Sequence, residues 1–119
     1  GQFDFSRHRY YSFPLPFVSN LIGGKGMLTV EIAIATFGNT ITGEAIIKKL
    51  ESFNPKMRSA INLRLAGQKL GDIDGVKKRE KLSQQMLDDI RLIVDEPNTE
   101  KPSAITDLHF VKFVISEAY

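Results

Sequence analysis

Apolar and polar residues alternate in two segments near the start of the chain. In YSFPLPF, residues 11–17, large apolar groups recur at every second position, as in a half-buried strand. Pro14 and Pro16 remove two backbone donors from the same side, which predicts an edge strand. After a glycine turn at residues 23–26, MLTVEIAIATF at 27–37 alternates β-branched residues with polar or small ones. This pattern predicts a long central strand.

The pattern then changes to a helical period. Thr42 is a suitable cap for a short helix that stops around Ser52. In the next stretch, NPKMRSAI, Asn54 suits the cap and Pro55 the first position of a new helix, where a missing N–H costs nothing. We therefore predict two successive helices with an abrupt change of axis, the second ending in the region 67–75. The apolar stripe of this second helix is Met57, Ala60, Ile61 and Leu65.

A third helix and a last strand complete the predicted elements. The helix starts near Asp72 or Asp74, whose carboxylates favour a helix N-terminus, and continues to about Glu96. Its apolar arc consists of Val76, Leu82, Met86, Leu87, Ile90, Ile93 and Val94. Residues 107–116, DLHFVKFVIS, are apolar on both sides, as in a buried strand. The order β-β-α-α-α-β predicts an α+β domain, with a small antiparallel or mixed sheet and three helices packed on one face.

The composition is typical of one globular domain. Of 119 residues, 42% are apolar and 25% charged. We expect residues 1–10 to form a linker and residues 11–119 a single domain. Sixteen basic against fourteen acidic residues leave a net charge of +2, too small to indicate a nucleic-acid partner. The sequence has no cysteine and no apolar run long enough to cross a bilayer.

Residues that could carry chemistry are few and scattered. The two histidines, His8 and His109, have no carboxylate or second histidine at ligand spacing. The acid pairs 88–89 and 95–96 point in different directions on a helix, so we interpret them as a solvated face. The basic run at 77–81 is interrupted by an acid and lacks stacking aromatics. We predict no enzyme activity, no catalytic or metal site, no cofactor, no small-molecule substrate and no nucleic acid.

Two arginines depart from the amphipathic pattern. Arg64 falls in the apolar stripe of the second helix, and Arg79 falls in the arc of the third. Because a buried, unpaired guanidinium is unfavourable, each must reach solvent, meet an acid or face a second subunit. Aromatic residues are also dense at the start of the chain, where they can dock on a neighbour or lead towards a membrane. These residues are Phe3, Phe5, Tyr10 and Tyr11.

Several short motifs, taken in order, carry a family resemblance. They are PFVSNL with its Asn20-Leu21 pair, the step from Pro55 to Arg58, the long helix with Leu82, Met86 and Ile90, and FVKFVIS with Phe110 to Val114. In this order they resemble the extracytoplasmic domain of the FliL family of flagellar basal-body-associated proteins, from about Tyr11 to Ser116. The chain has Ser59, Arg91 and Ser116 where that family often has Asp, Asn and Gln.

The resemblance implies a fold, a location and a role. The implied fold is similar to the stomatin/prohibitin-like (SPFH-like) domain. The full-length protein is expected to have one transmembrane helix before residue 1, with this domain in the periplasm at the bacterial inner membrane. The implied role is in motility, as a ring-like homo-oligomer that supports the ion-driven stator units. Expected partners are therefore further copies of the chain, flagellar stator proteins and the membrane.

For the interface we select three arginines, Arg58, Arg64 and Arg79, together with the aromatic start as the connection to the membrane helix. Two other functions remain open from the sequence. A general stomatin-like membrane scaffold would share the fold without the stator. A small hydrolase or phosphate-binding enzyme would need a convergent polar pocket, which the sequence does not reveal.

Overall fold

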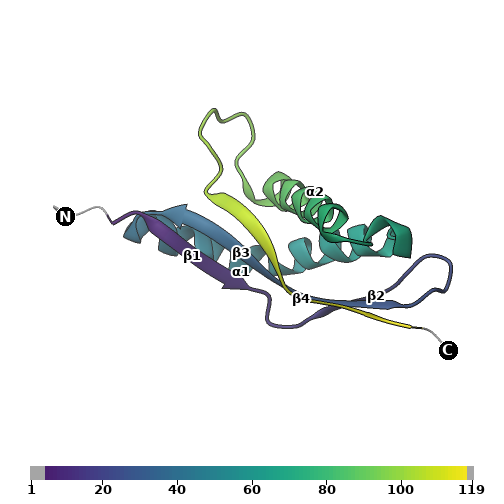
Figure 1. Ribbon diagram of the computed structural model, residues 1–119. Coiled ribbons are helices and arrows are strands. Elements are labelled where there is room, and N and C mark those ends of the chain that lie inside the picture. Colours follow the sequence, from purple (N-terminus) through teal and green to yellow (C-terminus); the bar gives the residue numbers. More distant parts are fainter. Residues whose placement is uncertain (1–4, 118–119) are drawn as a thin grey trace.

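An antiparallel four-stranded sheet lies against two long helices in the computed structural model, which describes residues 5–117 (Figure 1). The elements are β1 (Arg7–Ser12), β2 (Phe17–Asn20), β3 (Met27–Gly38), α1 (Thr40–Ala66), the 3-10 helix η1 (Leu70–Asp72), α2 (Val76–Val94) and β4 (Ile105–Ser116). The expected α+β class is confirmed. The expected three helices are wrong, because the described chain forms two α-helices and one short 3-10 helix. The molecule is elongated, with extents of 60, 27 and 26 Å.

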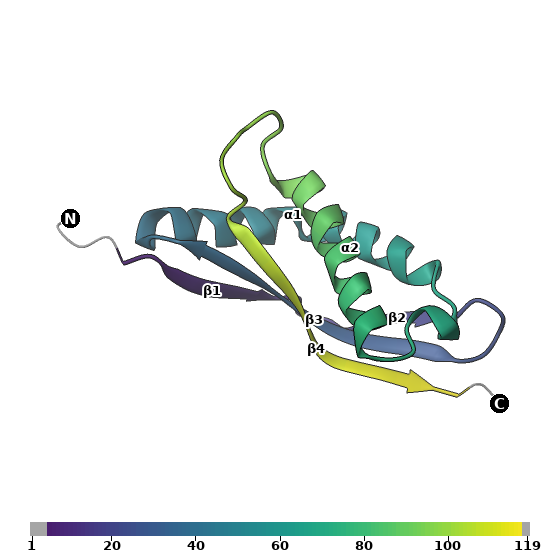
Figure 2. The ribbon, with the colours of Figure 1, turned by 45° about the horizontal axis from the view of Figure 1, so that its top comes forward.

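The strand β3 is the centre of the sheet, as predicted. β1 pairs with its second half and β2 with its first half along one side, while β4 pairs along the other side. Both helices lie on the same face of this sheet (Figure 2). The residues of β3 that face the helices are buried, and they are Leu28, Val30, Ile32 and Ile34. On the opposite face, Glu31 and Phe37 are exposed.

The strand predicted over residues 11–17 is divided in two. β1 and β2 are separated by residues 13–16, which include both prolines and do not continue the strand. Phe13 still donates its N–H to the carbonyl of Ile32 at 3.0 Å, so the chain leaves the sheet only after that residue. β1 and β2 pair with β3 alone. The predicted edge position is therefore confirmed, but the edge is interrupted.

A single helix, α1, replaces the two successive helices predicted around Asn54 and Pro55, and Pro55 lies inside it. Asn54 is not a cap, because its side-chain amide donates to the Tyr11 hydroxyl at 2.6 Å. The buried residues Leu50, Met57, Ile61 and Leu65 follow one face of α1 on both sides of the proline. Burial of each such side chain is worth roughly 1.5–3 kcal/mol, and the four together exceed the roughly 3 kcal/mol that a proline inside a helix costs through its lost hydrogen bond and its steric clash. Packing therefore outweighs the local stop signal.

The start of α1 also differs from the prediction. Asn39 is the cap, and its carboxamide oxygen accepts from the N–H of Thr42 at 2.8 Å. The Thr42 hydroxyl accepts from the N–H of Asn39 at 3.0 Å. Thr42 therefore belongs to the capping motif, but it lies three residues after the cap. The helix begins before the expected position.

The helix α2 matches the predicted third helix with a shorter span. It begins at Val76 rather than near Asp72 or Asp74, because Asp72 belongs to η1, where its carboxylate accepts from the N–H of Lys69 at 2.9 Å. The helix ends at Val94, shortly before the expected limit. Most of the predicted arc is buried: Leu82, Met86, Leu87, Ile90 and Val94. Ile93 is half-buried, and Val76 has 71% of its surface exposed, because it starts the helix beyond the edge of the core.

The last strand is an edge strand and is not buried on both faces. Only Ile105 and Leu108 are buried in β4. The pairing with β3 shifts register twice, which leaves Thr106 and Val111 without a partner residue on β3. Such bulges change the alternation, so Phe110 and Phe113 face the helices together, with their rings 5.1 Å apart. The prediction of a strand buried on both faces was wrong because the period of two was extended across a bulge.

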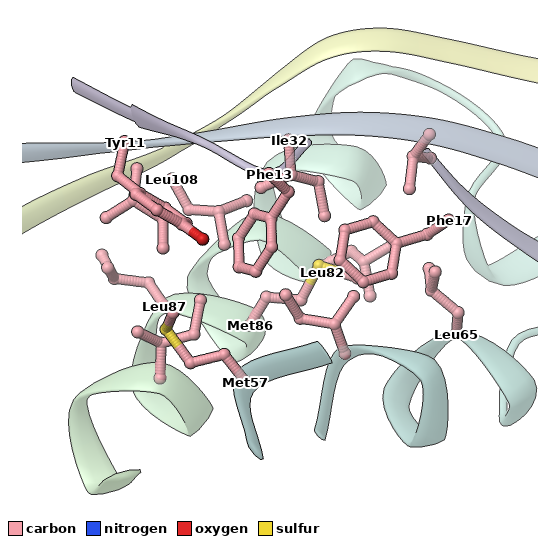
Figure 3. Packing of buried hydrophobic residues seen from close by; sticks show 14 of the residues in the cluster. Tyr11, Phe13, Phe17, Ile32, Met57, Leu65, Leu82, Met86, Leu87 and Leu108 are labelled. Carbon is pink, nitrogen blue, oxygen red and sulfur yellow. The ribbon is translucent and has the colours of Figure 1, made fainter. Parts of the chain in front are cut away.

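One hydrophobic core lies between the sheet and both helices (Figure 3). It joins side chains of the β1–β2 segment, β3, both helices and β4, and those labelled in the figure are Tyr11, Phe13, Phe17, Ile32, Met57, Leu65, Leu82, Met86, Leu87 and Leu108. Phe13 stacks edge-to-face with Tyr11 and with Phe17, at centroid distances of 5.3 and 5.1 Å. The interrupted edge is therefore anchored in the core by its aromatic residues.

Candidate functional site

Arg58 of α1 holds the interruption between β1 and β2. Its guanidinium donates to the carbonyl oxygens of Leu15 at 2.5 Å and Pro16 at 3.3 Å, and lies 4.0 Å from the centroid of the Phe17 ring. These carbonyls lie outside the strands, and the planar fork of an arginine can bind two of them at once. As placed, Arg58 is engaged within the chain, where it fixes the path of the interrupted edge.

Arg64 meets an acid on the neighbouring helix. Its Nε and Nη2 donate to the two carboxylate oxygens of Asp89 on α2, at 2.9 and 2.8 Å. The hydrogen bonds that the Arg64 guanidinium donates to Asp89 raise the pKa of Arg64, against a smaller opposing effect of desolvation. Of the three outcomes considered for this arginine, pairing with an acid is the one observed. Asp89 was expected on a solvated face and is instead part of this link between the helices, whereas Asp88 is exposed.

Arg79 ties the first turn of α2 to its surroundings. Its Nε donates to the carbonyl of Ile73 at 3.2 Å, and its guanidinium carbon lies 4.4 Å from the centroid of the Phe113 ring on β4. The side chain is half-buried, so its stem covers apolar surface while the charge rests on an aromatic face. Arg79 therefore joins α2 to the second half of β4.

A fourth arginine has a role that was not predicted from the sequence. Arg91 donates from Nε and Nη2 to the carbonyl of Ile105, at 3.0 and 2.8 Å, and so fixes the start of β4 to α2. Asp95 has a related role, since it accepts from the hydroxyl of Ser103 at 3.0 Å in the loop that follows α2. Arg91 stands where the resembled family often has Asn, and that departure was the one signal available in the sequence.

The aromatic residues predicted for the start of the chain lie in different environments. Tyr11 is buried, with its hydroxyl bonded to Asn54, so it contributes to the core. Tyr10 is 61% exposed on the face of the sheet opposite the helices, and Phe5 is also exposed. Phe3 lies outside the described residues. The expected boundary between linker and domain at residue 11 falls inside β1, because residues 7–10 already pair with β3.

The face of the sheet opposite the helices is a candidate interaction surface. Large apolar side chains exposed on these strands are Tyr10, Val18, Met27, Phe37, Val111 and Val114. Ala33 and Ala35 lie between them on β3 and are themselves buried. The rings of Tyr10 and His109, one from each neighbouring strand, are 6.4 Å apart. This face therefore combines apolar and polar groups on a rigid sheet.

A groove between the helices is a second candidate surface. It has a volume of about 570 Å³ and is lined by Ala60, Leu63, Arg64, Gly67, Gln68, Asp89, Leu92 and Ile93. Leu63 and Leu92 are 78% and 85% exposed on opposite walls. The ion pair of Arg64 and Asp89 lies among them, so the groove offers exposed leucines beside a fixed, hydrogen-bonded pair of charges.

Groups that could act chemically are separated in the structure. The Nδ1 atom of His8 lies 3.1 Å from the carbonyl oxygen of Thr36, and His109 is exposed on another strand. Within residues 5–117, no three or more His, Cys, Asp or Glu side chains gather in a way that could hold a metal ion. A polar hollow of about 400 Å³ near the start of α2 includes Lys78 and Lys81, and the Lys78 ammonium donates to the carbonyl of Gly71 at 2.6 Å.

None of the helices in the described chain is both long and apolar enough to cross a membrane.

The chain matches a known protein family over most of its length. A scan against protein families matches residues 10–115 to the family described as flagellar basal body-associated protein FliL. A search of curated proteins found none that matches the chain. The family match spans both candidate surfaces and all four arginines.

Proposed function

We propose that this chain, which belongs to the FliL family of flagellar basal body-associated proteins, supports the stator units of the flagellar motor without enzymatic activity. A function associated with the flagellar basal body follows from the family itself. The stator role goes beyond the family match, and the observation that supports it is the extent of that match, residues 10–115.

The proposed mechanism is a shift of population in the stator. A self-associated ring of these domains contacts the extracytoplasmic linker of the stator and favours its extended form. A difference in binding free energy of about 3 kcal/mol between two forms changes their ratio about 150-fold, so modest contacts are sufficient. A rigid, non-enzymatic surface suits this task, because binding energy alone has to distinguish the two forms.

We propose that the groove between α1 and α2 contacts the stator. Leu63 and Leu92 provide the apolar area that a transient interface needs, and Arg64 provides a partly exposed cation. Arg58 and Arg79 contribute indirectly, by fixing the sheet edge and the start of α2. The proposed roles of these three arginines therefore differ.

We also propose, from the family resemblance, a periplasmic location at the inner membrane. In this proposal a transmembrane helix precedes residue 1, and the exposed rings of Phe5 and Tyr10 lie on the side of the domain nearest that helix. A likeness to the stomatin/prohibitin-like fold belongs to the same proposal. It is supported by the α+β class and by the elongated sheet with helices on one face.

The test replaces the native gene by variants in the organism that encodes it. Leu63→Asp with Leu92→Asp places charges on both walls of the groove, and we expect smaller swimming halos and fewer motors with recruited stator units. Ile41→Asp is the matched control, because Ile41 is 81% exposed on α1 but is not among the residues that line the groove. Wild-type swimming and wild-type stator recruitment in the double variant would remove the groove from the proposal.

A second arm separates a stator role from a general membrane scaffold. The tagged protein is recovered from membranes that contain or lack the stator proteins, and the material that accompanies it is compared. We expect stator proteins among the recovered material. Recovery of the same set of proteins from both membranes would contradict the stator role.

A further inference from the structure

The outer edge of β4 from Lys112 to Ser116 is unoccupied by other elements of the described chain. This segment, the β4 edge segment, pairs with residues 27–31 of β3 without interruption. Within the described residues, no hydrogen bond joins its opposite side to another element. Figure 2 shows the second half of β4 along the margin of the molecule, with neither a helix nor a strand beyond it. An edge of this kind presents unpaired N–H and C=O groups and can accept another strand.

The other edge of the sheet differs in ways that discourage pairing. It consists of two short strands separated by residues 13–16, with two prolines in the interruption. Arg58 binds two carbonyl groups of that interruption, and β1 carries the cations Arg7 and Arg9. Interruptions, prolines and charges are the usual means by which proteins protect an edge. The β4 edge segment carries only Lys112 as a charge, and Lys112 is opposite Glu31 on β3.

We propose that the β4 edge segment pairs with the same segment of a second copy of this chain, antiparallel and around a twofold axis at Val114. In this register Val114 faces Val114 of the second copy, Phe113 faces Ile115, and Lys112 faces Ser116. Paired residues then lie on the same face of the joined sheet, with the exposed valines together and the half-buried Phe113 and Ile115 together. No charge faces a like charge.

The bulge and the end of the strand select this register. Val111 has no partner on β3, so the regular pairing of β4 ends at Lys112 on one side and at Ser116 on the other. Val114 is the middle of that segment, and a twofold axis there gives the largest number of paired residues. A shift by one residue would place exposed side chains opposite half-buried ones. A shift by two would place Phe113 opposite Glu117 or shorten the pairing.

The pairing gives a structural basis for the self-association in the proposed function and rests on that part of it. It does not depend on the proposed role at the stator. A twofold contact uses the same segment in both copies and closes at two chains. Further growth of an assembly must then use another surface, such as the face of the sheet opposite the helices. The test uses the purified chain without any stator protein, so its failure leaves the stator proposal standing.

The first experiment uses a single introduced cysteine, since the chain has none of its own. Val114→Cys places one thiol at the proposed axis. Val18→Cys is the matched control, because Val18 and Val114 are both opposite Thr29 on β3, on the same face but at opposite edges. With a short bis-maleimide cross-linker, we expect covalent dimers from Val114→Cys and essentially none from Val18→Cys. Equal cross-linking of the two variants, or none from either, would overturn the proposal.

The second experiment tests the twofold axis directly. Val114→Lys brings two like charges together, and we expect the dimer to be weakened by about tenfold or more in sedimentation over a range of concentrations. Val114→Glu is expected to do the same, while a mixture of the two variants recovers the dimer. Unchanged circular dichroism and thermal midpoints show that each variant is folded. A monomeric wild-type chain at every concentration, or no recovery in the mixture, contradicts the pairing.

Discussion

The two edges of the sheet differ in how their unpaired backbone groups are protected. The β1–β2 edge is interrupted, and its exposed carbonyls are bound by Arg58 from α1. The β4 edge keeps a continuous strand, with bulges at Thr106 and Val111 and its first carbonyl bound by Arg91 from α2. Each helix thus supplies an arginine to the edge that it lies near. The difference is that β4 leaves the β4 edge segment free, whereas the other edge has no uninterrupted free strand of similar composition.

The comparison of the two edges shows which surfaces of this protein are not used in contacts within the chain. Side chains predicted for an interface are largely used to hold edges in place, and the surfaces that remain are the helix groove, the opposite face of the sheet and the β4 edge segment. Three substitutions, in order of decreasing expected effect, test how firmly each edge is held, and a double-mutant cycle tests the link between the helices.

Gly26→Ala should have the largest effect, on the β4 side. Gly26 has φ of +154°, and an added Cβ would lie 2.6 Å from the carbonyl oxygen of Ser116. Since that oxygen belongs to the backbone, the end of β4 must move. We expect a loss of about 3 kcal/mol in the free energy of unfolding, measured by urea denaturation. The control Gly24→Ala, with positive φ but no atom within 4 Å of an added Cβ, should lose only about 1 kcal/mol.

Arg58→Met should have the next largest effect, on the β1–β2 side. The substitution keeps an apolar stem but removes two hydrogen bonds and the contact with the Phe17 ring. We expect a loss of about 2 kcal/mol in the free energy of unfolding. Lys56→Met is a suitable control, because Lys56 lies on the same helix and its ammonium is 5.6 Å from the centroid of the Phe53 ring, away from the β1–β2 edge. Equal effects of the two substitutions would show that Arg58 does not hold this edge.

Arg91→Met is the corresponding change at the β4 edge. Only one carbonyl loses its donor, and no aromatic contact is removed, so about 1 kcal/mol is expected. Amide hydrogen exchange provides the sharper measurement. Protection should fall at the start of β4 and remain unchanged in β1. A uniform fall across the sheet would contradict a local role for Arg91.

The ion pair between Arg64 and Asp89 should give the smallest effect, because it links the helices and touches neither edge. A double-mutant cycle with Arg64→Met and Asp89→Asn should give a coupling of about 0.5–1 kcal/mol, since more than a third of the Arg64 side chain is exposed. The raised pKa of Arg64 keeps this arginine charged in the folded state, so its contribution is complete at neutral pH and is lost only as pH rises through that raised value. Between neutral and moderately alkaline pH the coupling should be constant, and a steady decline over that range would contradict the assignment.

Elements with a long uninterrupted pattern were predictable from the sequence. β3 and α2 follow periods of two and 3.6 with few exceptions, and both appear close to the expected positions. The errors concern positions where tertiary packing overrides a local signal. Pro55 is a good helix start in isolation, yet burial of Met57 and Ile61 on the same face as Leu50 keeps α1 continuous. The bulge at Val111 leaves no local mark that distinguishes it from a regular strand.

The candidate site was less predictable than the fold. The misplaced charge of Arg64 correctly indicated an unusual environment, but its partner Asp89 comes from another helix, and long-range pairs are not encoded by spacing. Arg58 and Arg91 donate hydrogen bonds to backbone carbonyls, and no sequence pattern predicts which carbonyl will lack a backbone hydrogen-bond donor. The exposed leucines of the groove, Leu63 and Leu92, could have been found as apolar residues outside the buried stripes of their helices.

The long axis of the molecule has a mechanical consequence. β1 begins beside the last residues of β3, and β4 ends beside the first residues of β3. The two ends of the described chain therefore lie at opposite ends of the long axis (Figure 1). A body 60 Å long with such an arrangement acts as a strut. Whatever is attached near Arg7 is held away from whatever is attached near Ser116 by most of that length, and the continuous α1 braces the span against bending.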